Sequence, residues 1–294
     1  MNYSIADFIL HTEGKHSNIA ECGLGSFKPF EIEGDCTAEP TMILHTDCPI
    51  SNSTHPTTKV IHTFEFEQDY ATGELARYAE GYRFSTSREG VDYLMIKRDG
   101  SNIVESNFGN FEKVDPSLLR FGLWIMLGIV IAPLGAIAIH SSVVVKEHQG
   151  ILCLGESGTG KSTHTRLWRE NIEGAKLLND DSPIIRMIDG ECRVYGSPWS
   201  GKTPCYRNIE APVGGIVSIK QHSENIIRRL SPVEAFTILL PACSSMKWDA
   251  RIYNGICDSI TKFIQTCKIW ELQCLPNNEA AILCHDTICK ESHS

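Results

Sequence analysis

The sequence lacks the features that mark disulfide-stapled, zinc-binding or nucleic-acid-binding proteins. Its 12 cysteines include no C-x-x-C pair and no metal-ligand spacing, so we expect most of them to be buried free thiols. Positive charge is scarce, with 27 Lys and Arg against 36 Asp and Glu and a formal net charge of -9. A chain this acidic is poorly suited to a phosphate backbone, and we expect no nucleic-acid partner.

The sequence also lacks a recognisable targeting signal. Its amino terminus, MNYSIADFIL, has no basic segment before an apolar core and no small-residue cleavage site, which favours a cytoplasmic protein. One uncharged run, Phe121 to Ile139, is nearly long enough to span a bilayer. Asp115-Pro116 provides an N-cap and a first-turn proline, and Pro133 ends the helix. We therefore predict a buried helix over 116–132 and no membrane partner, with membrane attachment as the alternative.

The hydrophobic pattern changes character near residue 115. Between Lys59 and Glu105, apolar and polar residues alternate with a period of two, which is typical of half-buried strands. The segments VDYLMIKR and SNIVES flank Asp99-Gly100 and predict a hairpin. We therefore predict an antiparallel, β-rich module over residues 1–114, within which residues 1–58 give only weak signals.

Residues 115–294 alternate between helical patterns and short apolar strands, which indicates an α/β domain. The predicted strands are 136–140, 142–147, ILCL, KLLN, IIRMI, CRVYG, GGIVSIK and 269–275. The predicted helices after 116–132 are one that ends near Trp168 and others at 232–242, 257–267 and 278–289.

The octet GESGTGKS, Gly155–Ser162, fits the pattern G-x-x-x-x-G-K-[ST] without a mismatch. Its glycines let the backbone turn N–H groups inward, which makes a concave anion site at the start of a helix. Lys161 would neutralise the β- and γ-phosphates, and the Ser162 hydroxyl would ligate magnesium. The sequence thus predicts ATP and Mg²⁺ as cofactors. The residues expected to bind them are Gly155, Glu156, Ser157, Gly158, Thr159, Gly160, Lys161, Ser162 and Thr163.

Two adjacent aspartates close the next predicted strand. Between Lys161 and Asp180 there is room only for a helix, a turn and one strand, which together with ILCL form a compact βαβ unit. Because the crossover of such a unit is right-handed and its strands are parallel, both carboxyl ends lie at one sheet edge. One of Asp180 and Asp181 can then hold magnesium, while the other accepts or orients the proton of an attacking hydroxyl. A solvated acidic turn or a helix cap before Ser182-Pro183 is the alternative.

The segments HSS, GESGTGKST and LNDD, taken together, resemble the HPr kinase/phosphorylase and ATP-dependent phosphoenolpyruvate carboxykinase group, over about residues 135–220. The resemblance implies that residues 115–294 are a P-loop nucleotide-binding kinase domain. It implies that Asp180 is the catalytic base and that Ser162 and Asp181 lie at the magnesium, although the order of the aspartates can be reversed. It also implies a catalytic role for His140 beside Lys161. A buried, hydrogen-bonded strand histidine is the alternative for His140.

The chain departs from that group at two places. The glycine usual after the histidine is Ser141, and YGSPWSGK, Tyr195–Lys202, replaces the glycine-rich signature that follows the double aspartate. HPr is therefore not the expected substrate, and the chain is too short for a carboxykinase. Lys202 and Arg207 are candidates to clamp an anionic acceptor, with an ordinary surface loop as the alternative.

The sequence therefore predicts an ATP-dependent phosphotransferase acting on a hydroxyl acceptor, with serine or a seryl peptide or protein favoured. Members of the resembling group assemble into rings, so the resemblance raises a homo-oligomer as one possibility and the oligomeric state stays open. The alternative is a nucleotide-gated binding protein, in which ATP orders a loop and little phosphate is transferred. The acceptor, the kinase or phosphorylase direction and the role of the β-rich module stay open.

Overall fold

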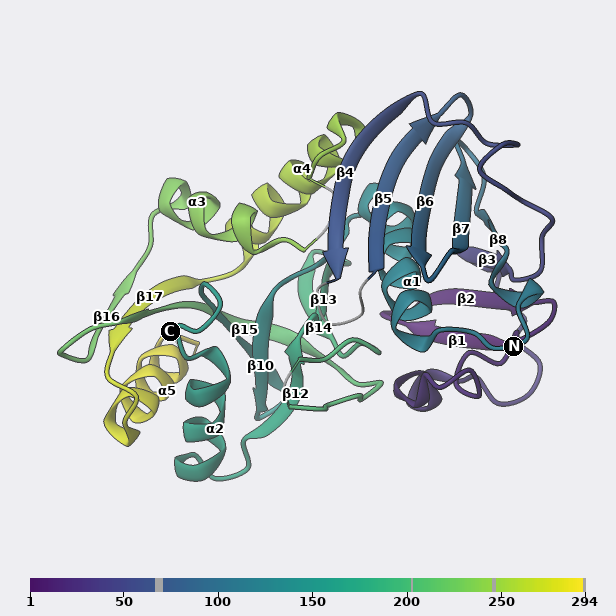
Figure 1. Ribbon diagram of the computed structural model, residues 1–294. Coiled ribbons are helices and arrows are strands. Elements are labelled where there is room, and N and C mark those ends of the chain that lie inside the picture. Colours follow the sequence, from purple (N-terminus) through teal and green to yellow (C-terminus); the bar gives the residue numbers. More distant parts are fainter. Residues whose placement is uncertain (67–70, 202, 245–246, 293–294) are drawn as a thin grey trace. The chain divides into compact units, whose positions relative to one another are not determined.

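A computed structural model describes residues 1–66, 71–201, 203–244 and 247–292. The molecule is a mixed α/β protein whose chain forms two compact units, each built on its own sheet (Figure 1). The first unit runs from Met1 to Ile131 and takes in a short later segment that ends at Ala250. The second unit holds the rest of the chain from Ala132 onwards.

The first unit contains an eight-stranded sheet in the order β1-β2-β3-β8-β7-β6-β5-β4. Its strands are β1 (Asn2–Ile5), β2 (Phe8–Glu13), β3 (Met42–His45), β4 (Lys59–Phe66), β5 (Ala71–Tyr78), β6 (Gly81–Arg88), β7 (Val91–Arg98) and β8 (Ile103–Ser106), and its 3-10 helices are η1 (Gly25–Phe30) and η2 (Phe108–Asn110). The predicted hairpin is confirmed, because β7 and β8 pair antiparallel across Asp99-Gly100.

The prediction of a wholly antiparallel module is wrong for one part of this sheet. β3 runs parallel to both β2 and β8. The chain between β2 and β3 makes a long connection through η1, and parallel strands need such a connection. The β1–β2 turn uses Ala6 and Asp7 at φ of 52° and 60°. Because this turn contains no glycine, the hairpin could not be predicted from the usual turn residues.

The uncharged run is α1, Pro116–Ile131, followed by the 3-10 turn η3, Ala132–Leu134. Asp115 caps the helix, since its Oδ1 accepts hydrogen bonds from the N–H groups of Ser117 at 3.0 Å and Leu118 at 3.3 Å. The predicted helix and its cap are confirmed. By length and composition alone, Pro116–Leu134 is the one helical stretch in the described part of the chain that could cross a membrane. Within its most apolar 18 residues, 61% is buried inside the protein.

The division between the two compact units falls after Ile131, whereas the sequence suggested a boundary between residues 114 and 115. α1 packs against β6 and β7 of the first sheet, where Gly122 lies against Met95 and Phe84. Phe121 of α1 also contacts the ring of Phe64 edge to face, with ring centroids 5.0 Å apart. The first sheet therefore covers the helix, and the division between the units falls after α1.

The second unit contains a nine-stranded sheet with the order β12-β10-β11-β15-β14-β13-β9, to which β17 is added beside β15 and β16 beside β17. Its strands are β9 (Ala136–Ala138), β10 (Ser141–Lys146), β11 (Gln149–Leu154), β12 (Lys176–Asp181), β13 (Ile184–Ile188), β14 (Glu191–Tyr195), β15 (Glu210–Gln221), β16 (Ile226–Arg229) and β17 (Ile269–Cys274). Its helices are α2 (Lys161–Asn171), α3 (Pro232–Ala242), α4 (Ala250–Thr266) and α5 (Asn278–Ser292). These elements confirm the predicted ones, except that α4 begins about two turns earlier than expected and that β16 was not predicted.

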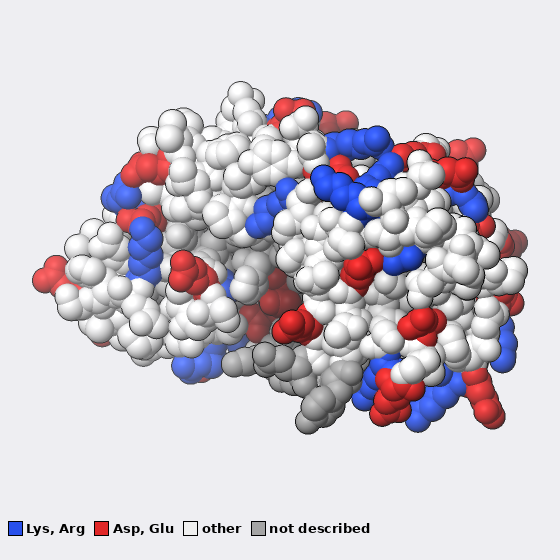
Figure 2. All heavy atoms as spheres, turned by 45° about the horizontal axis from the view of Figure 1, so that its top comes forward, with Lys and Arg blue, Asp and Glu red and all other residues white. Residues whose placement is uncertain are grey.

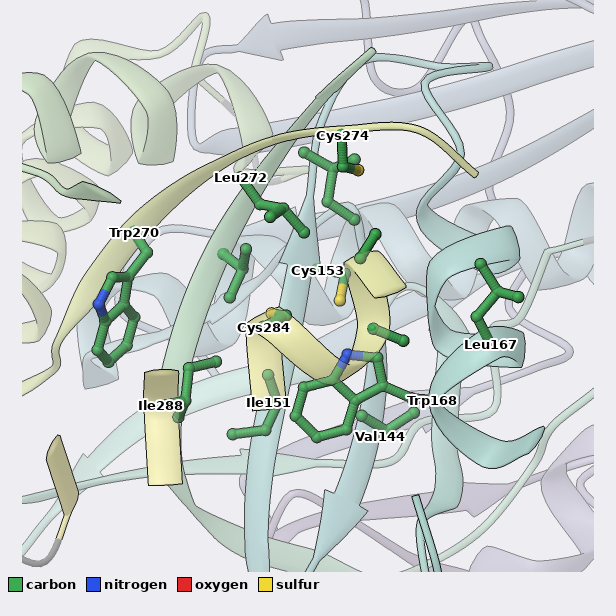
Figure 3. Close-up of a cluster of buried hydrophobic side chains, with 14 of the residues drawn as sticks. Val144, Ile151, Cys153, Leu167, Trp168, Trp270, Leu272, Cys274, Cys284 and Ile288 are labelled. Atoms are coloured by element: carbon green, nitrogen blue, oxygen red, sulfur yellow. The ribbon is translucent and has the colours of Figure 1, made fainter. Parts of the chain in front are cut away.

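The core of the second unit lies between the sheet and the helices α2 and α5, which pack side by side (Figures 1 and 3). Trp168 of α2 and Trp270 of β17 are its largest buried side chains. The thiols of Cys153, Cys274 and Cys284 belong to the same cluster (Figure 3). All 12 cysteines are free thiols and most are buried, as predicted. Each buried thiol packs as a small apolar group.

One strand arrangement positions the site. β10 lies between β11 and β12 and runs antiparallel to both. β11 and β12 therefore run in the same direction and end at the same sheet edge, as predicted, although the crossover passes over β10. Because β10 begins at that edge, Ser141 lies opposite Asp181.

Candidate functional site

A glycine-rich loop, Gly155–Gly160, connects β11 to the start of α2. Gly155, Gly158 and Gly160 have φ of +150°, +83° and +104°, a region that residues with a Cβ rarely adopt. A Cβ on Gly155 would also lie 2.5 Å from Thr159 Oγ1. The loop thus holds the first amides and the positive dipole end of α2 toward its interior, which favours an anion there.

Lys161 is held over this loop. Its side chain is largely buried, and Nζ donates hydrogen bonds to the carbonyl oxygens of Gly155 at 2.9 Å and Glu156 at 3.0 Å. Desolvation lowers the pKa of Lys161, while the charges of Asp181 and Asp180 oppose that shift. The ammonium group therefore already stands where it can exchange carbonyl partners for the oxygens of an anion.

Ser162 and Asp180 are joined across the same edge. Ser162 Oγ donates a hydrogen bond of 2.8 Å to Asp180 Oδ1. Asp180 is 3% exposed, and its backbone oxygen accepts hydrogen bonds from the Gly201 N–H and from Ser200 Oγ. The carboxylate is thus fixed at the end of β12, against the first turn of α2. A hydroxyl and a carboxylate are ligands that Mg²⁺ accepts beside water and phosphate.

Asp181 has a different environment from its neighbour. Its φ of +136° is a strained conformation for a residue with a side chain. The side chain is 43% exposed, and Oδ1 lies 3.5 Å from His140 Nε2. The backbone N–H of His140 donates to the Ala242 oxygen at the end of α3. Burial and the charge of Lys161 lower the pKa of His140, against the charges of Asp181 and Asp180, so its imidazole is neutral at pH 7.

Ser141 carries a hydroxyl that sequence reasoning did not assign to the site. The residue is 0% exposed, and Oγ has no hydrogen-bond partner among the described residues. The Oγ of the following residue, Ser142, is hydrogen-bonded to Thr165 Oγ1 at 2.8 Å. A buried hydroxyl without a partner is costly. The replacement of a glycine by Ser141 after His140 was the signal that could have identified it.

These groups surround a cavity of about 320 Å³. It is lined by Ser157, Gly158 and the stretch 160–163, by both aspartates, and by His140, Ser141 and Gly201. Gly155, Glu156 and Thr159, which were also predicted to bind the nucleotide, line an adjoining cavity instead. The structure therefore brings together His140, Lys161, Ser162, Asp180 and Asp181, whose predicted roles stay predictions.

The segment after β14 is tied to the same strand end through Asn179. This buried side chain donates hydrogen bonds to the Trp199 oxygen at 3.0 Å and accepts one from the Ser182 N–H at 3.0 Å. Sequence reasoning did not single out Asn179; the signal was an amide within an apolar strand. Arg207 is exposed and lines neither cavity, and Lys202 lies outside the described residues.

The surface charges on one face of the molecule are mixed. On the face shown in Figure 2, Lys and Arg side chains are interspersed with Asp and Glu. Within residues 1–66, 71–201, 203–244 and 247–292, no group of three or more His, Cys, Asp or Glu side chains gathers to hold a metal ion. A magnesium ion here would therefore rely on few protein ligands, as such ions do when phosphates supply the others.

No protein-family model matches this sequence, and no curated protein matches it. Among solved structures, the chain is similar to the Hpr(Ser) kinase/phosphatase from Coxiella burnetii, at 12% sequence identity and a TM-score of 0.32. The alignment covers 53% of this chain and 95% of that chain. The similarity is distant and concerns the fold alone.

Proposed function

We propose that this protein is a cytoplasmic, ATP- and magnesium-dependent phosphotransferase with a P-loop, which transfers a phosphoryl group to a hydroxyl acceptor. The observation that carries the proposal is the 2.8 Å hydrogen bond from Ser162 Oγ to Asp180 Oδ1. This contact joins the hydroxyl that ends a phosphate-binding motif to a buried carboxylate on a parallel strand end. P-loop enzymes hold magnesium with such a pair.

The residues present fit a magnesium-bound triphosphate. The glycine-rich loop offers amides at a helix start, and Lys161 supplies a charge that carbonyl groups hold in place. Ser141 Oγ is a buried donor without a partner among the described residues, on the wall of the cavity. Ser162 and Asp180 would hold the metal. When bound, Mg²⁺ neutralises the negative charge on the phosphate oxygens.

The two aspartates then take the reverse of the roles first expected. Asp180, buried against Ser162, serves the metal, and Asp181, half-exposed beside His140, accepts or orients the proton of the acceptor hydroxyl. Lys161 stabilises charge on the transferred phosphoryl group. The neutral imidazole of His140 positions Asp181. A homo-oligomeric assembly is a further part of the proposal that rests on the sequence. The sequence alone also supports substrate roles for Lys202 and Arg207, but Arg207 lines neither cavity.

Calorimetry with MgATP tests the nucleotide site. We expect the wild type to bind MgATP, and Lys161→Ala to weaken binding at least about tenfold, which is roughly 1.4 kcal/mol. Lys176→Ala, at the exposed opposite end of β12, is the matched control and should bind as the wild type does. Absence of uptake by the wild type would refute the proposal.

A transfer assay tests the chemistry. The protein and MgATP are incubated with a pool of serine, seryl peptides and small alcohols, and new phosphorylated products are followed by mass spectrometry. We expect at least one phosphomonoester. Slow hydrolysis alone, whatever is added, would instead favour a nucleotide-gated binding protein.

A further inference from the structure

A second cavity adjoins the proposed triphosphate site. Its volume is about 690 Å³, and it shares His140, Ser157 and Gly158 with the smaller cavity. The remaining walls come from Gly155, Glu156 and Thr159 of the glycine-rich loop, from the end of β15 and from α3. A molecule in the second cavity can therefore reach the end of the first that His140 and Asp181 mark.

The walls of this second cavity are mostly uncharged. Ile219, Ile238 and Pro241 provide aliphatic surface, and Thr237 and Gln221 provide polar groups. The charged residues among the described lining are Glu156 and Lys220, which have opposite signs.

The charge of Lys220 is already compensated. Its Nζ lies 2.5 Å from Oε2 of Glu271, whose side chain is 3% exposed. Arg228 also pairs with this buried carboxylate, at 3.1 Å. The described walls thus offer no pair of cations for the carboxylate or phosphate of an acceptor.

The wall formed by α3 is held in place from both ends. At its start, Ser231 and Glu234 form a capping box, and at its end the Ala242 oxygen accepts the hydrogen bond from the N–H of His140. Gln221 Nε2 donates to the Gly158 oxygen at 3.4 Å, which links β15 to the glycine-rich loop. The cavity is therefore preformed, and its volume lies in the range of sites for drug-sized ligands.

We propose that the second cavity is the acceptor site, and that it takes an uncharged hydroxyl compound larger than a single amino acid, whose aliphatic part lies on α3. This inference rests on the proposed function. The acceptor oxygen forms a bond to the γ-phosphorus, the bond from that phosphorus to the β,γ-bridging oxygen breaks, and the hydroxyl proton passes to Asp181. The products are a phosphomonoester and ADP.

The nucleoside of ATP is the competing occupant of this cavity. Ser162 and Asp180 would hold the metal-bound end of the triphosphate, and the second cavity shares with that end the side chain of His140, whose Nε2 lies 3.5 Å from Asp181 Oδ1. A nucleoside leaves from the other end. Besides His140, the described lining contains no aromatic ring on which a base could stack.

The test fills the cavity and compares acceptors of known charge. Ile238→Trp adds bulk to the α3 wall, and Val233→Trp adds it on the same helix at a position that is 76% exposed. The acceptor probes are an N-acetylated seryl tripeptide amide, hexyl glucoside and free L-serine. Thr237→Arg, which places a cation at an exposed position of the wall, is a second variant in case the first one does not fold.

We expect at least one neutral probe to be phosphorylated with a KM at least tenfold below that of free serine. Ile238→Trp should raise that KM about tenfold and leave the Kd for MgATP unchanged, whereas Val233→Trp should change neither. Thr237→Arg should reduce the difference in KM between the neutral probe and free serine. Which neutral probe reacts distinguishes a peptide segment from a non-peptide alcohol.

Three results would overturn the inference and leave the proposed function standing. In the first, Ile238→Trp weakens the affinity for MgATP and leaves the acceptor KM unchanged. In the second, Ile238→Trp changes neither the Kd for MgATP nor the acceptor KM. In the third, free serine is the best acceptor. Failure of the wild type to bind MgATP would instead refute the proposed function itself.

Discussion

Two adjacent carboxylates at the end of β12 show how far neighbouring residues can differ. Asp180 is buried and accepts a hydrogen bond from Ser162, whereas Asp181 is strained, half-exposed and close to His140. Alternation along a strand predicts that they point to opposite faces. It does not predict which face each takes, because the register of β10 against β12 shifts between Val143 and Val144.

Substitution of each aspartate should separate metal binding from proton transfer. Asp180→Asn should weaken magnesium-dependent ATP binding, measured by calorimetry. Asp181→Asn should leave that affinity within about twofold and lower kcat about 10²- to 10⁴-fold, the usual contribution of a general base. Asp189→Asn, in the turn between β13 and β14, is the control for both. If kcat is equal in Asp181→Asn and the wild type, Asp181 does not take part in proton transfer.

Ser141 and Ser142 form a matched pair for testing the buried hydroxyl. Ser141→Ala removes a hydroxyl without a described partner, so the free energy of unfolding should not fall, while the Kd for MgATP should rise about tenfold. Ser142→Ala breaks the bond to Thr165 and should cost about 1 kcal/mol of stability without changing that Kd. Urea denaturation and calorimetry give both quantities. A stability loss in Ser141→Ala with unchanged binding would contradict the assignment.

At the scale of elements, α2 contains a histidine that couples stability to pH. Trp168 Nε1 donates a hydrogen bond of 3.1 Å to His164 Nε2, so the ring is neutral and accepts. Burial lowers the pKa of His164 from 6.5 to about 4. Below pH 6.5 the unfolded chain therefore binds a proton that the folded protein excludes.

We expect His164 to contribute stability that is complete above pH 6.5 and lost as the pH falls toward about 4. The full loss is about 3 kcal/mol, from the shift in pKa. Urea denaturation between pH 7.5 and 4.5 measures it. In His164→Gln the amide oxygen accepts the same bond without titrating, so the free energy of unfolding should fall less steeply with decreasing pH. An unchanged pH dependence of that free energy would refute the role of His164.

The segment between β14 and β15 depends on a close backbone contact. A Cβ on Gly196 would lie 1.9 Å from the Arg207 oxygen, and backbone atoms cannot move aside cheaply. Gly196→Ala should therefore lower the free energy of unfolding by about 3 kcal/mol. Gly128→Ala, in α1 with open space around the new Cβ, should raise it by about 0.5–1 kcal/mol. Thermal unfolding of both variants checks the contrast.

The sequence predicted elements well where the local signal was strong. α1, the glycine-rich loop and β11 to β15 have clear caps, turns or apolar runs. β1, β2 and β3 were not predicted, because the first turn uses Ala6 and Asp7 and the partner of β3 is distant along the chain. Pairing of that kind depends on contacts that no short window contains.

At the scale of the whole molecule, the division into units follows α1. The helix is apolar nearly all round, so its sequence does not reveal which sheet covers it. The loop and the strand-end aspartates could be placed at one sheet edge from topology alone. The contributions of Ser141, Gly201 and α3 could not, because these residues come from separate segments that only the folded chain brings to the site.

Burial of α1 predicts how the whole protein fractionates. Since the first sheet covers the helix, we expect the expressed chain to stay in the supernatant after high-speed centrifugation without detergent. Sedimentation with membranes, reversed only by detergent, would mean that Pro116–Leu134 contacts lipid instead.

The cysteine thiols differ in burial between the two units, so their labelling can report opening of the second unit. The buried ones, Cys153, Cys192, Cys205, Cys243, Cys267, Cys274 and Cys284, all belong to the second unit, whereas Cys22, Cys36 and Cys48 of the first are partly accessible. Burial raises the pKa of Cys153 to about 12 and also raises the pKa of Cys274. In the native protein these sulfurs are thus inert as well as shielded. A thiol-labelling time course should therefore show a fast phase from the partly accessible thiols, which include Cys257 and Cys289 of the second unit, and a slow phase that reports opening of the second unit.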